Sequence, residues 1–355
     1  MKKIFVINPG ATSTKVAYFE DEKQIFGTEL TYNIDDLKVF KTVFEQLDLR
    51  FKDIKNIINT HLTNINFDAV VGRGGLLPPV EAGAIEVNDE LIDCLKNRPI
   101  LEHASNLGAA LADKVAKEFG SISAKSFIYD PVTVDQMDNI ARISGSSLIE
   151  RSSTGHALNM RAVARTIAKT LNKPYEESNI IVVHVGGGAS ASAHKKGRMI
   201  DVISDDEVMF SSERTGGIPL KQYIKLCYMY DKQTVTELTR KKGGLVSYFG
   251  TNDARKIHEL MNNGDEKALL VLRAMAYQIA KAIGELATVL KGNVDATVLT
   301  GGIAHSSFIA EEVHERVKFI APFFTVPGEK EMSALANGAL RVLNGEETAQ
   351  IFKEK

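Results

Sequence analysis

The sequence predicts an α/β protein made of two related halves. Residues 3–19 are echoed by residues 180–193 near the midpoint, and each copy is an apolar run, a turn of small residues and a second apolar run. Runs of strand length alternate with longer stretches of helical period, which is typical of α/β domains. With 355 residues the chain is long enough for two cores. The repeat indicates a duplication whose two turns hold a nucleotide phosphate chain between them.

The first half contains five expected strands and one clear helix. The helix covers 106–119, because Leu107, Leu111 and Val115 recur every four residues and share one face. A second helix is expected at 35–47. The strands are expected at residues 4–8, 16–19, 24–30, 68–71 and 126–129.

A boundary near residue 150 is predicted by a helix at 157–171, which Gly155 precedes and Asn172-Lys173-Pro174 ends. The second half then begins at residue 179. Its longest helix, at 265–290, is expected to be buried in the core. The apolar residues at helical spacing in this helix are Leu269, Leu272, Ala276, Ile279, Ile283 and Leu286.

The end of the chain is expected to return to the first half. A strand at 323–326 leads into a helix at 333–343, and in duplicated folds such a final helix packs on the first domain. The predicted domains are therefore 1–151 with 333–355, and 152–332.

The composition is that of an ordinary globular protein. Apolar residues make up 44% and charged residues 25%, and the formal net charge of -2 gives no reason to expect a nucleic-acid partner. Cys94 and Cys227 are isolated, so we expect them to pack as small apolar groups in a reducing cytoplasm. The first apolar run stops after Ile7 and no other segment approaches membrane length, so no membrane partner is expected.

Three glycine-rich turns are candidates for phosphate contacts. The first, at 8–15, is by itself as readily a plain hairpin loop. The second, Gly186-Gly187-Gly188, favours phosphate binding, because close approach of backbone N–H groups to a phosphate needs glycine. The third, Gly301-Gly302, follows a strand and precedes an expected helix, which suits an adenosine or phosphate contact. Neither a Walker A sequence nor GxGxxG occurs, which counts against P-loop and Rossmann folds.

Five motifs carry a resemblance to a known family. They are Asn-Pro-Gly-Ala-Thr-Ser-Thr-Lys at 8–15, Gly-Arg-Gly-Gly at 72–75, His-Val-Gly-Gly-Gly-Ala-Ser at 184–190, Glu-Arg-Thr-Gly at 213–216 and Thr-Gly-Gly-Ile at 300–303. In order and spacing, over nearly the whole chain, they resemble the acetate and butyrate kinase family, within the superfamily of acetate and sugar kinases, Hsp70 and actin. The resemblance implies duplicated ribonuclease H-like domains of the actin-like ATPase fold, which close over ATP and a magnesium ion in an interdomain nucleotide cleft.

The resemblance also implies which residues contact the nucleotide. At the place of Ala11 acetate kinases commonly have another serine, so one hydroxyl of the first phosphate loop is missing here. The second phosphate loop begins at a histidine. The implied nucleotide-binding residues are Asn8, Ser13, Lys15, His184, Gly186, Gly187, Gly188, Gly301, Gly302 and Ile303.

The implied charged residues of the active site lie in short loops. Arg73 and Arg214 resemble the two arginines that hold the carboxylate and the transferring phosphoryl group, because guanidinium forks suit multiply charged oxygens. Asp130 resembles the catalytic aspartate, which helps to place magnesium or polarises the attacking group, although an aspartate before proline is also a common turn residue. Glu331 resembles the magnesium-linked glutamate, with Glu329 as the alternative.

Two histidines complete the implied catalytic set. His156 resembles the histidine that hydrogen-bonds the phosphoryl group in the transition state, and His103 resembles another active-site histidine of the first domain. Phosphoryl transfer depends on positioning and on neutralising the equatorial oxygens, so no Ser/His/Asp relay is needed. The implied reaction is a reversible in-line transfer between ATP and a short-chain carboxylate, which gives ADP and an acyl phosphate.

The acid is expected to be larger than acetate. Gly75 and Gly155 stand where acetate kinases have a bulky valine and phenylalanine in the acetate pocket. Loss of those side chains is expected to leave room for several methylenes, each contributing about 0.8 kcal/mol when buried. Butyrate, isobutyrate or similar branched acids are therefore favoured over acetate.

Two further expectations come from the resemblance. The family usually forms homodimers through its second domain, so a homo-oligomer is expected. The alternative from a different class is a regulatory, non-catalytic nucleotide-binding protein of the same fold. Arg73 together with Arg214 argues against it, because such a protein has no second substrate to hold.

Overall fold

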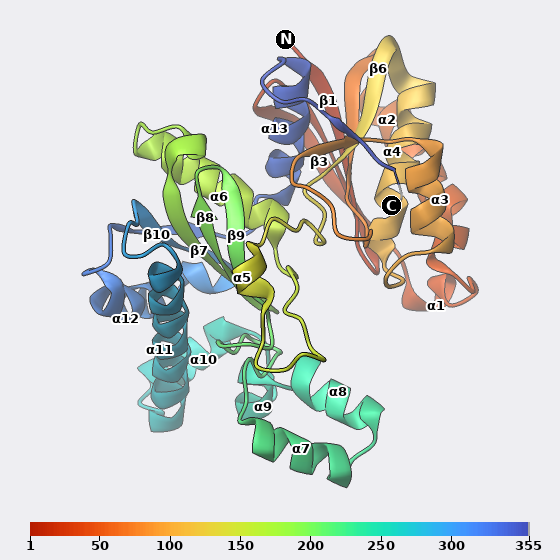
Figure 1. Ribbon diagram of the computed structural model, residues 1–355. Coiled ribbons are helices and arrows are strands. Elements are labelled where there is room, and N and C mark those ends of the chain that lie inside the picture. The colour runs from red at the N-terminus through yellow and green to blue at the C-terminus, as the bar shows by residue number, and fades with distance from the viewer. Residues whose placement is uncertain (354–355) are drawn as a thin grey trace. The chain divides into compact units, whose positions relative to one another are not determined.

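The computed structural model describes residues 1–353 and divides the chain into two compact units, whose elements are labelled in Figure 1. Unit 1 comprises Met1–Val134 together with the chain from Lys330 onward, and unit 2 comprises Asp135–Glu329.

The first division falls earlier than the boundary at residue 151 that the sequence indicated. The amide of Asp138 donates to the Ile200 carbonyl at 2.9 Å. The Arg151 guanidinium donates to Asp201 at 3.1 Å and to Glu207 at 2.6 Å. These bonds join residues 135–151 to unit 2, and local sequence patterns carry no sign of them because the partners lie about fifty residues further along the chain.

Unit 1 is built on one seven-stranded sheet with the strand order β12-β5-β6-β4-β1-β2-β3. The first three strands form an antiparallel meander, and β4 and β6 continue the sheet parallel to β1. All five strands predicted for this half are present, with ends shifted by a few residues. The strands are β1 (Lys3–Pro9), β2 (Ser13–Glu20), β3 (Lys23–Thr31), β4 (Phe67–Arg73), β5 (Ala84–Glu86), β6 (Gly120–Tyr129) and β12 (Gln350–Ile351).

The helices of unit 1 lie on both faces of this sheet. On one face, α2 and α4 share a core with β1, β2 and β4, where Phe5, Phe67 and Leu111 are fully buried. On the other, α13 contacts β1, β4 and β6, and Figure 1 shows it across the sheet from α2 and α4. The helices are α1 (Ile34–Leu37), α2 (Leu47–His61), α3 (Asp89–Asn97), α4 (Leu107–Phe119) and α13 (Glu331–Leu343).

The helix predicted at 35–47 was wrong. Only the short α1 and a 3-10 turn, Val43–Gln46, lie in that range, and the long helix is α2, which begins where the prediction ended. The buried positions of α2 are Arg50, Ile54 and Ile58, which lie one turn apart. Because the first of these positions is an arginine, the apolar periodicity that would predict the start of this helix is interrupted.

Unit 2 repeats the central part of the first sheet. Its five strands have the order β11-β10-β7-β8-β9, with an antiparallel meander of three strands and two strands parallel to the first. Both meanders have an irregularity near the end of their second strand, between Tyr18 and Phe19 and between Ala193 and His194. The duplication and the ribonuclease H-like fold are therefore confirmed. The strands are β7 (Asn179–Val185), β8 (Ala189–Lys195), β9 (Arg198–Ile203), β10 (Ala296–Gly301) and β11 (Phe323–Pro327).

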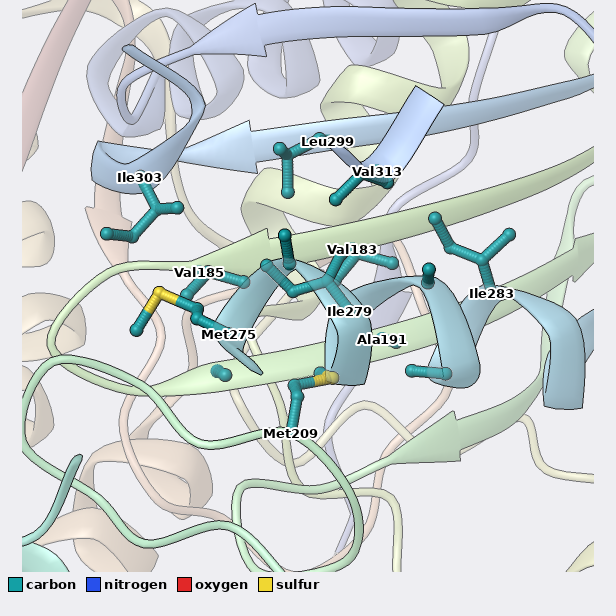
Figure 2. Close-up of a cluster of buried hydrophobic side chains, with 14 of the residues drawn as sticks. Val183, Val185, Ala191, Met209, Met275, Ile279, Ile283, Leu299, Ile303 and Val313 are labelled. Atoms are coloured by element: carbon teal, nitrogen blue, oxygen red, sulfur yellow. The ribbon is translucent and has the colours of Figure 1, made fainter. Parts of the chain in front are cut away.

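The main core of unit 2 lies between its sheet and α11 (Figure 2). Met275, Ile279 and Ile283 of α11 meet Val183 of β7 and Ala191 of β8 there. The predicted buried helix is thus confirmed, with Leu269 only half-buried. The helices of this unit are α5 (Asn139–Arg142), α6 (Ala157–Thr170), α7 (Leu220–Met229), α8 (Lys232–Arg240), α9 (Gly244–Phe249), α10 (Ala254–Asn262), α11 (Glu266–Val289) and α12 (Ser307–Val317).

The opposite face of β8 is polar. Ala189, Ala191 and Ala193 belong to the α11 core, so the alternating residues Ser190, Ser192 and His194 face the other side, where α6 packs. Within residues 1–353 no helix is long and apolar enough to cross a membrane.

Candidate active site

Three of the expected site residues lie at the ends of adjacent parallel strands of unit 1. Asn8 is near the end of β1, Arg73 is the last residue of β4, and Asp130 follows β6. Because β1, β4 and β6 are neighbours that run in the same direction, these residues share one edge of the sheet. The carboxyl edge of such a sheet is where α/β proteins usually bind ligands.

Glu331 connects two of these residues. It is the first residue of α13, and its Oε2 atom accepts a hydrogen bond from Asn8 Nδ2 at 2.7 Å. Its Oε1 atom forms an ion pair with the Arg73 guanidinium. Both side chains of the pair are mostly buried, so water screens their attraction only weakly. The glutamate thus orients the expected substrate-binding arginine beside the first phosphate loop.

Asp130 has a backbone conformation that is uncommon for an aspartate. Its φ is +39°, its side chain is buried, and its Oδ1 atom accepts the Gly83 amide at 2.7 Å. Its own amide donates to the Gly83 carbonyl at 3.2 Å. A strained position held by such contacts is typical of functional sites, and the same contacts also make this a turn aspartate.

His103 lies close to Arg73 and is held as a neutral ring. Burial lowers the pKa of His103, and the positive charge of Arg73 lowers it further. Its Nδ1 atom accepts the Ser105 amide at 3.2 Å, so the ring proton sits on Nε2. The ring therefore presents a hydrogen-bond donor without a charge at neutral pH.

The room expected at Gly75 is already occupied. A Cβ atom on Gly75 would lie 2.6 Å from both Asn106 Oδ1 and Leu95 Cδ2. The Asn106 side chain is fixed there, because its Oδ1 atom accepts the Leu76 amide at 2.8 Å. Close packing, and not space for a longer acid, is therefore the reason for glycine at this position, which corrects the prediction.

Gly155 leaves more space. A Cβ atom on Gly155 would lie 3.1 Å from Ser190 and 3.3 Å from Met160 Cε, which is tight but can be relieved by small shifts. The prediction that glycine widens the acid pocket is therefore kept for Gly155 and not for Gly75.

The first phosphate loop is the turn between β1 and β2. Ser13 and Lys15 alternate with the fully buried Thr14, so their side chains leave the strand on the opposite side from Thr14. The amides of Ala11 and Thr12 donate no hydrogen bond to any residue that the structure describes. Free backbone N–H groups in a turn are the usual ligands of phosphate oxygens.

The second phosphate loop, at residues 186–188, also has backbone amides without an acceptor among residues 1–353. The Gly186 carbonyl accepts the Ser212 amide and the Gly187 carbonyl accepts the Glu213 amide, both at 3.2 Å. The amides of Gly187 and Gly188 find no acceptor in the described part of the chain. The carbonyls of Gly186 and Gly187 are thus bound by residues 211–213, the Gly188 carbonyl accepts the Gly186 amide, and two amides of the loop stay available.

Arg214 packs directly on this loop. A Cβ atom on Gly188 would lie 2.6 Å from Arg214 Nη1, so any larger residue there would displace the guanidinium. The guanidinium forms an ion pair with Asp205, which also accepts from Arg240 at 3.0 Å. These three charged side chains line a cavity of about 300 Å³, together with Thr215.

His156 and His184 lie face to face, with ring centroids 3.9 Å apart and an angle of 17° between the rings. His156 Nδ1 is 2.8 Å from Ser190 Oγ, which also accepts the His156 amide at 3.1 Å. His184 Nδ1 accepts from Asn159 Nδ2 at 2.9 Å, so its proton lies on Nε2, which is buried 3.4 Å from Glu329 Oε1. His156, which is expected at the phosphoryl group, is therefore a neighbour of His184, which is expected in the second phosphate loop.

The third glycine turn is only partly available to a nucleotide. Gly301 has a φ of +86° and packs on the Val185 carbonyl, so it is fixed by the fold. A Cβ atom on Gly302 would meet nothing within 4 Å, which leaves this position open. The Ile303 side chain is buried in the core of unit 2 (Figure 2), and its contact with a nucleotide stays a prediction.

The carboxylates fit a metal ion that arrives with phosphates. No group of three or more His, Cys, Asp or Glu side chains that could hold a metal occurs within residues 1–353. Mg²⁺ commonly uses one or two protein carboxylates and completes its shell with phosphate oxygens and water. Asp130 and Glu331, at one edge of the unit 1 sheet, are oxygen donors of that kind, and Glu329 beside His184 is the other carboxylate near a phosphate loop.

Sequence reasoning missed several residues that hold the site in place. Ser190 and Asn159 orient the two histidines, and Asp205 orients Arg214. Arg50 reaches the first phosphate loop from α2. Only Ser190 had a visible signal, since it belongs to an alternating polar series on a predicted strand.

The duplicated units, the two loops with free amides and the arginine held beside each loop define a phosphotransferase of the actin-like ATPase fold. The chain belongs to the acetokinase family, whose sequence model matches residues 147–349. Butyrate kinase 1 of Clostridium acetobutylicum is 45% identical over 99% of this chain and 100% of its own length.

Solved structures agree on the fold. The acetate kinase of Porphyromonas gingivalis matches with a TM-score of 0.80 at 20% identity, over 97% of this chain and 100% of that one. A propionate kinase from Francisella tularensis matches with a TM-score of 0.74 at 18% identity, over 95% of this chain and 99% of that one.

Proposed function

We propose that the chain is a butyrate kinase, which transfers a phosphoryl group reversibly between ATP and butanoate to give ADP and butanoyl phosphate. The observation that carries this proposal is Arg73, which Glu331 holds beside Asn8 of the first phosphate loop. A guanidinium at that place can bind a second, anionic substrate next to the nucleotide phosphates. The full-length similarity to Butyrate kinase 1 supports butanoate as this substrate.

The proposed chemistry is a displacement at phosphorus. A carboxylate oxygen of the acid forms a bond to the γ-phosphorus of ATP while the bond to the ADP oxygen breaks, and ADP leaves with that electron pair. Arg73, Arg214 and His156 donate hydrogen bonds to the charged equatorial oxygens and to the carboxylate. His103 adds a neutral donor beside Arg73, and the loop amides bind the remaining phosphate oxygens.

A magnesium ion would come with the nucleotide. Asp130 and Glu331 would hold it, with Glu329 as the alternative to Glu331. When bound, the ion supplies positive charge to the phosphate oxygens. Both oxygens of Glu331 already accept from Asn8 and Arg73, so we propose that it binds the ion through water.

Butanoate is proposed over the alternatives, isobutyrate, isovalerate and acetate. The full-length similarity to Butyrate kinase 1 supports an acid longer than acetate, and glycine at position 155 adds no side chain that would shorten the site. We also propose a cytoplasmic homo-oligomer with no nucleic-acid partner. The net charge of -2 supports the absence of a nucleic-acid partner. The exposed apolar side chains of Leu220, Tyr228 and Met229 on α7 support contact between subunits.

The test is an acyl phosphate assay with hydroxylamine trapping, run with ATP and magnesium across acetate, propionate, butyrate, isobutyrate and isovalerate. We expect product to peak at butyrate and to be lost in Arg73→Ala and Arg214→Ala. Arg255→Ala is the control, because its side chain is 89% exposed and, among residues 1–353, its ion pair is with Asp253 on the surface. Gly155→Ala should move the peak towards shorter acids.

Two results would count against the proposal. A peak at acetate would overturn the preference for longer acids. If no acid gave acyl phosphate although ATP binds, the chain would instead be a regulatory nucleotide-binding protein.

A further inference from the structure

Arg50 is a buried cation that the proposed mechanism does not use. It lies in the first turn of α2, and none of its surface is exposed to solvent. Ile54 and Ile58, one and two turns further along the helix, lie in the apolar core. A charged group in such a place is costly unless each of its N–H groups finds an acceptor.

The acceptors of Arg50 belong to the first phosphate loop. Its Nη1 atom donates to the carbonyls of Gly10 and Ser13 and to Thr14 Oγ1, each at 2.9 Å. Its Nη2 atom donates to the Ala11 carbonyl at 3.1 Å. One guanidinium therefore binds four oxygens of five consecutive residues.

The rest of the guanidinium is also engaged by neutral groups. Gln46 Oε1 accepts from Nε at 3.1 Å and from Nη2 at 2.8 Å, and the Tyr32 ring lies 4.8 Å from the guanidinium carbon. Within residues 1–353 no carboxylate comes within ion-pair distance of Arg50. Burial lowers the pKa of Arg50, and an arginine still keeps its charge at neutral pH. Unit 1 thus holds a positive charge directly beneath the loop with no acid to balance it.

The contacts of Arg50 with the loop carbonyls also fix the direction in which the loop amides point. In a trans peptide the carbonyl of one residue and the N–H of the next point in opposite directions, and the structure has no cis peptide in residues 1–353. The carbonyls of Gly10 and Ala11 point at Arg50, so the amides of Ala11 and Thr12 point away from it. These are the two amides that have no partner among the described residues.

We propose that Arg50 is a positioning residue of the first phosphate loop. It draws the loop carbonyls inward, which directs the free amides outward, and its unbalanced charge strengthens the binding of a polyphosphate on the outer side. The negative charge of the bound anion then balances the Arg50 guanidinium, which has no carboxylate partner among residues 1–353. This inference rests on the proposed nucleotide site, but it concerns phosphate binding and not the identity of the acid.

The test measures binding, by calorimetry, of ATP, ADP and adenosine to the full chain and to Arg50→Met and Arg50→Lys. Methionine keeps most of the volume without the charge, and lysine keeps the charge without the fork. We expect the ADP dissociation constant to rise about tenfold in Arg50→Met and by less in Arg50→Lys. Adenosine binding should change less than twofold in both.

Arg161→Met is the matched control. Arg161 is also a buried arginine, in unit 2, and it donates to Gln136 Oε1 at 3.1 Å and to the Gly197 carbonyl at 3.4 Å. It should lower the melting temperature without changing the ratio of ADP to adenosine affinity. If Arg50→Met does not fold, Arg50→Lys decides by the same ratio.

An unchanged ratio in the folded Arg50 variants would overturn the inference, as would an equal loss of ADP and adenosine binding. The outcome is separate from the proposed function. A wild-type chain that binds ATP but makes no acyl phosphate from any acid would refute the kinase, while the Arg50 ratio would still be measurable.

Discussion

Replacing Ser190 with alanine should slow the reaction without weakening substrate binding. The Ser190 hydroxyl is bound to His156 at two points, the ring Nδ1 atom at 2.8 Å and the amide at 3.1 Å. Both are lost together in Ser190→Ala, and the ring is then free to rotate away from the phosphoryl group. Because Nδ1 faces the serine, the contact proposed between His156 and the phosphoryl group is through Nε2.

The expected magnitude follows from these two bonds. A typical hydrogen bond contributes about 1 kcal/mol net, so the pair contributes about 2 kcal/mol. A change of about 1.4 kcal/mol in the barrier is tenfold in rate. We therefore expect kcat to fall about thirtyfold if both bonds are lost outright, and about fivefold if water replaces one. The assay is acyl hydroxamate formation at saturating ATP and butyrate, with KM measured for each substrate.

Ser192→Ala is the matched control. Ser192 lies two residues along the same face of β8, and its hydroxyl is also buried against Met160, with Sδ at 3.3 Å. Its other partner is His194 Nε2 at 2.8 Å. Ser192→Ala should lower stability by a similar amount and leave kcat within twofold of the wild type. An equal loss of kcat in both variants, or none in Ser190→Ala, would refute the positioning of His156.

Three further outcomes are expected. Gly75→Ala should lower the melting temperature in a thermal denaturation scan, because the new methyl group enters space that two side chains fill; unchanged stability would restore the pocket interpretation. Gly188→Ala should displace Arg214 and abolish acyl phosphate formation, whereas Gly284→Ala, whose Cβ atom meets nothing within 4 Å, should not. Burial, followed by the nearby arginines, lowers the pKa of His194 from 6.5 to about 3. Its unfolded form therefore binds a proton that the native form does not, and stability should be lost as the pH falls from 6.5 towards 3, by about 1.4 kcal/mol per pH unit. In urea unfolding between pH 7 and 5, His194→Gln should show a shallower loss than the wild type; parallel curves would contradict this.

Much of the fold could be predicted because it depends on near neighbours in the chain. The strands of the first meander, the first two strands of the second, and α4, α6 and α11 are visible as apolar runs or helical periodicity, and their ends agree with the structure within a few residues. The prediction of a helix at 35–47 failed because one contact that fixes the true helix is not between near neighbours in the chain. The face of α2 that packs inward begins with Arg50, and a periodicity of apolar residues does not recognise a buried arginine whose acceptors lie in another segment.

For the candidate site too, the local features were predictable from the sequence and the non-local ones were not. Glycine turns after strands indicated the two phosphate loops, because close backbone approach is a local requirement that sequence displays. The space around a residue is not local. Leu95 and Asn106 come from other elements to fill the room beside Gly75, and the core of unit 2 takes the side chain of Ile303.

By itself, the sequence determined the duplication, the main strands and longest helices of each half, and the residue types that phosphate chemistry requires, since each is visible in short-range patterns. Only the tertiary structure decided which of those residues meet. Glu331 reaches Asn8 and Arg73 across more than two hundred residues, and Arg50 reaches the carbonyls of Gly10, Ala11 and Ser13 from a separate helix. The physical reason is that buried charges and polar groups must find partners in three dimensions, and the chain folds so that distant segments supply them.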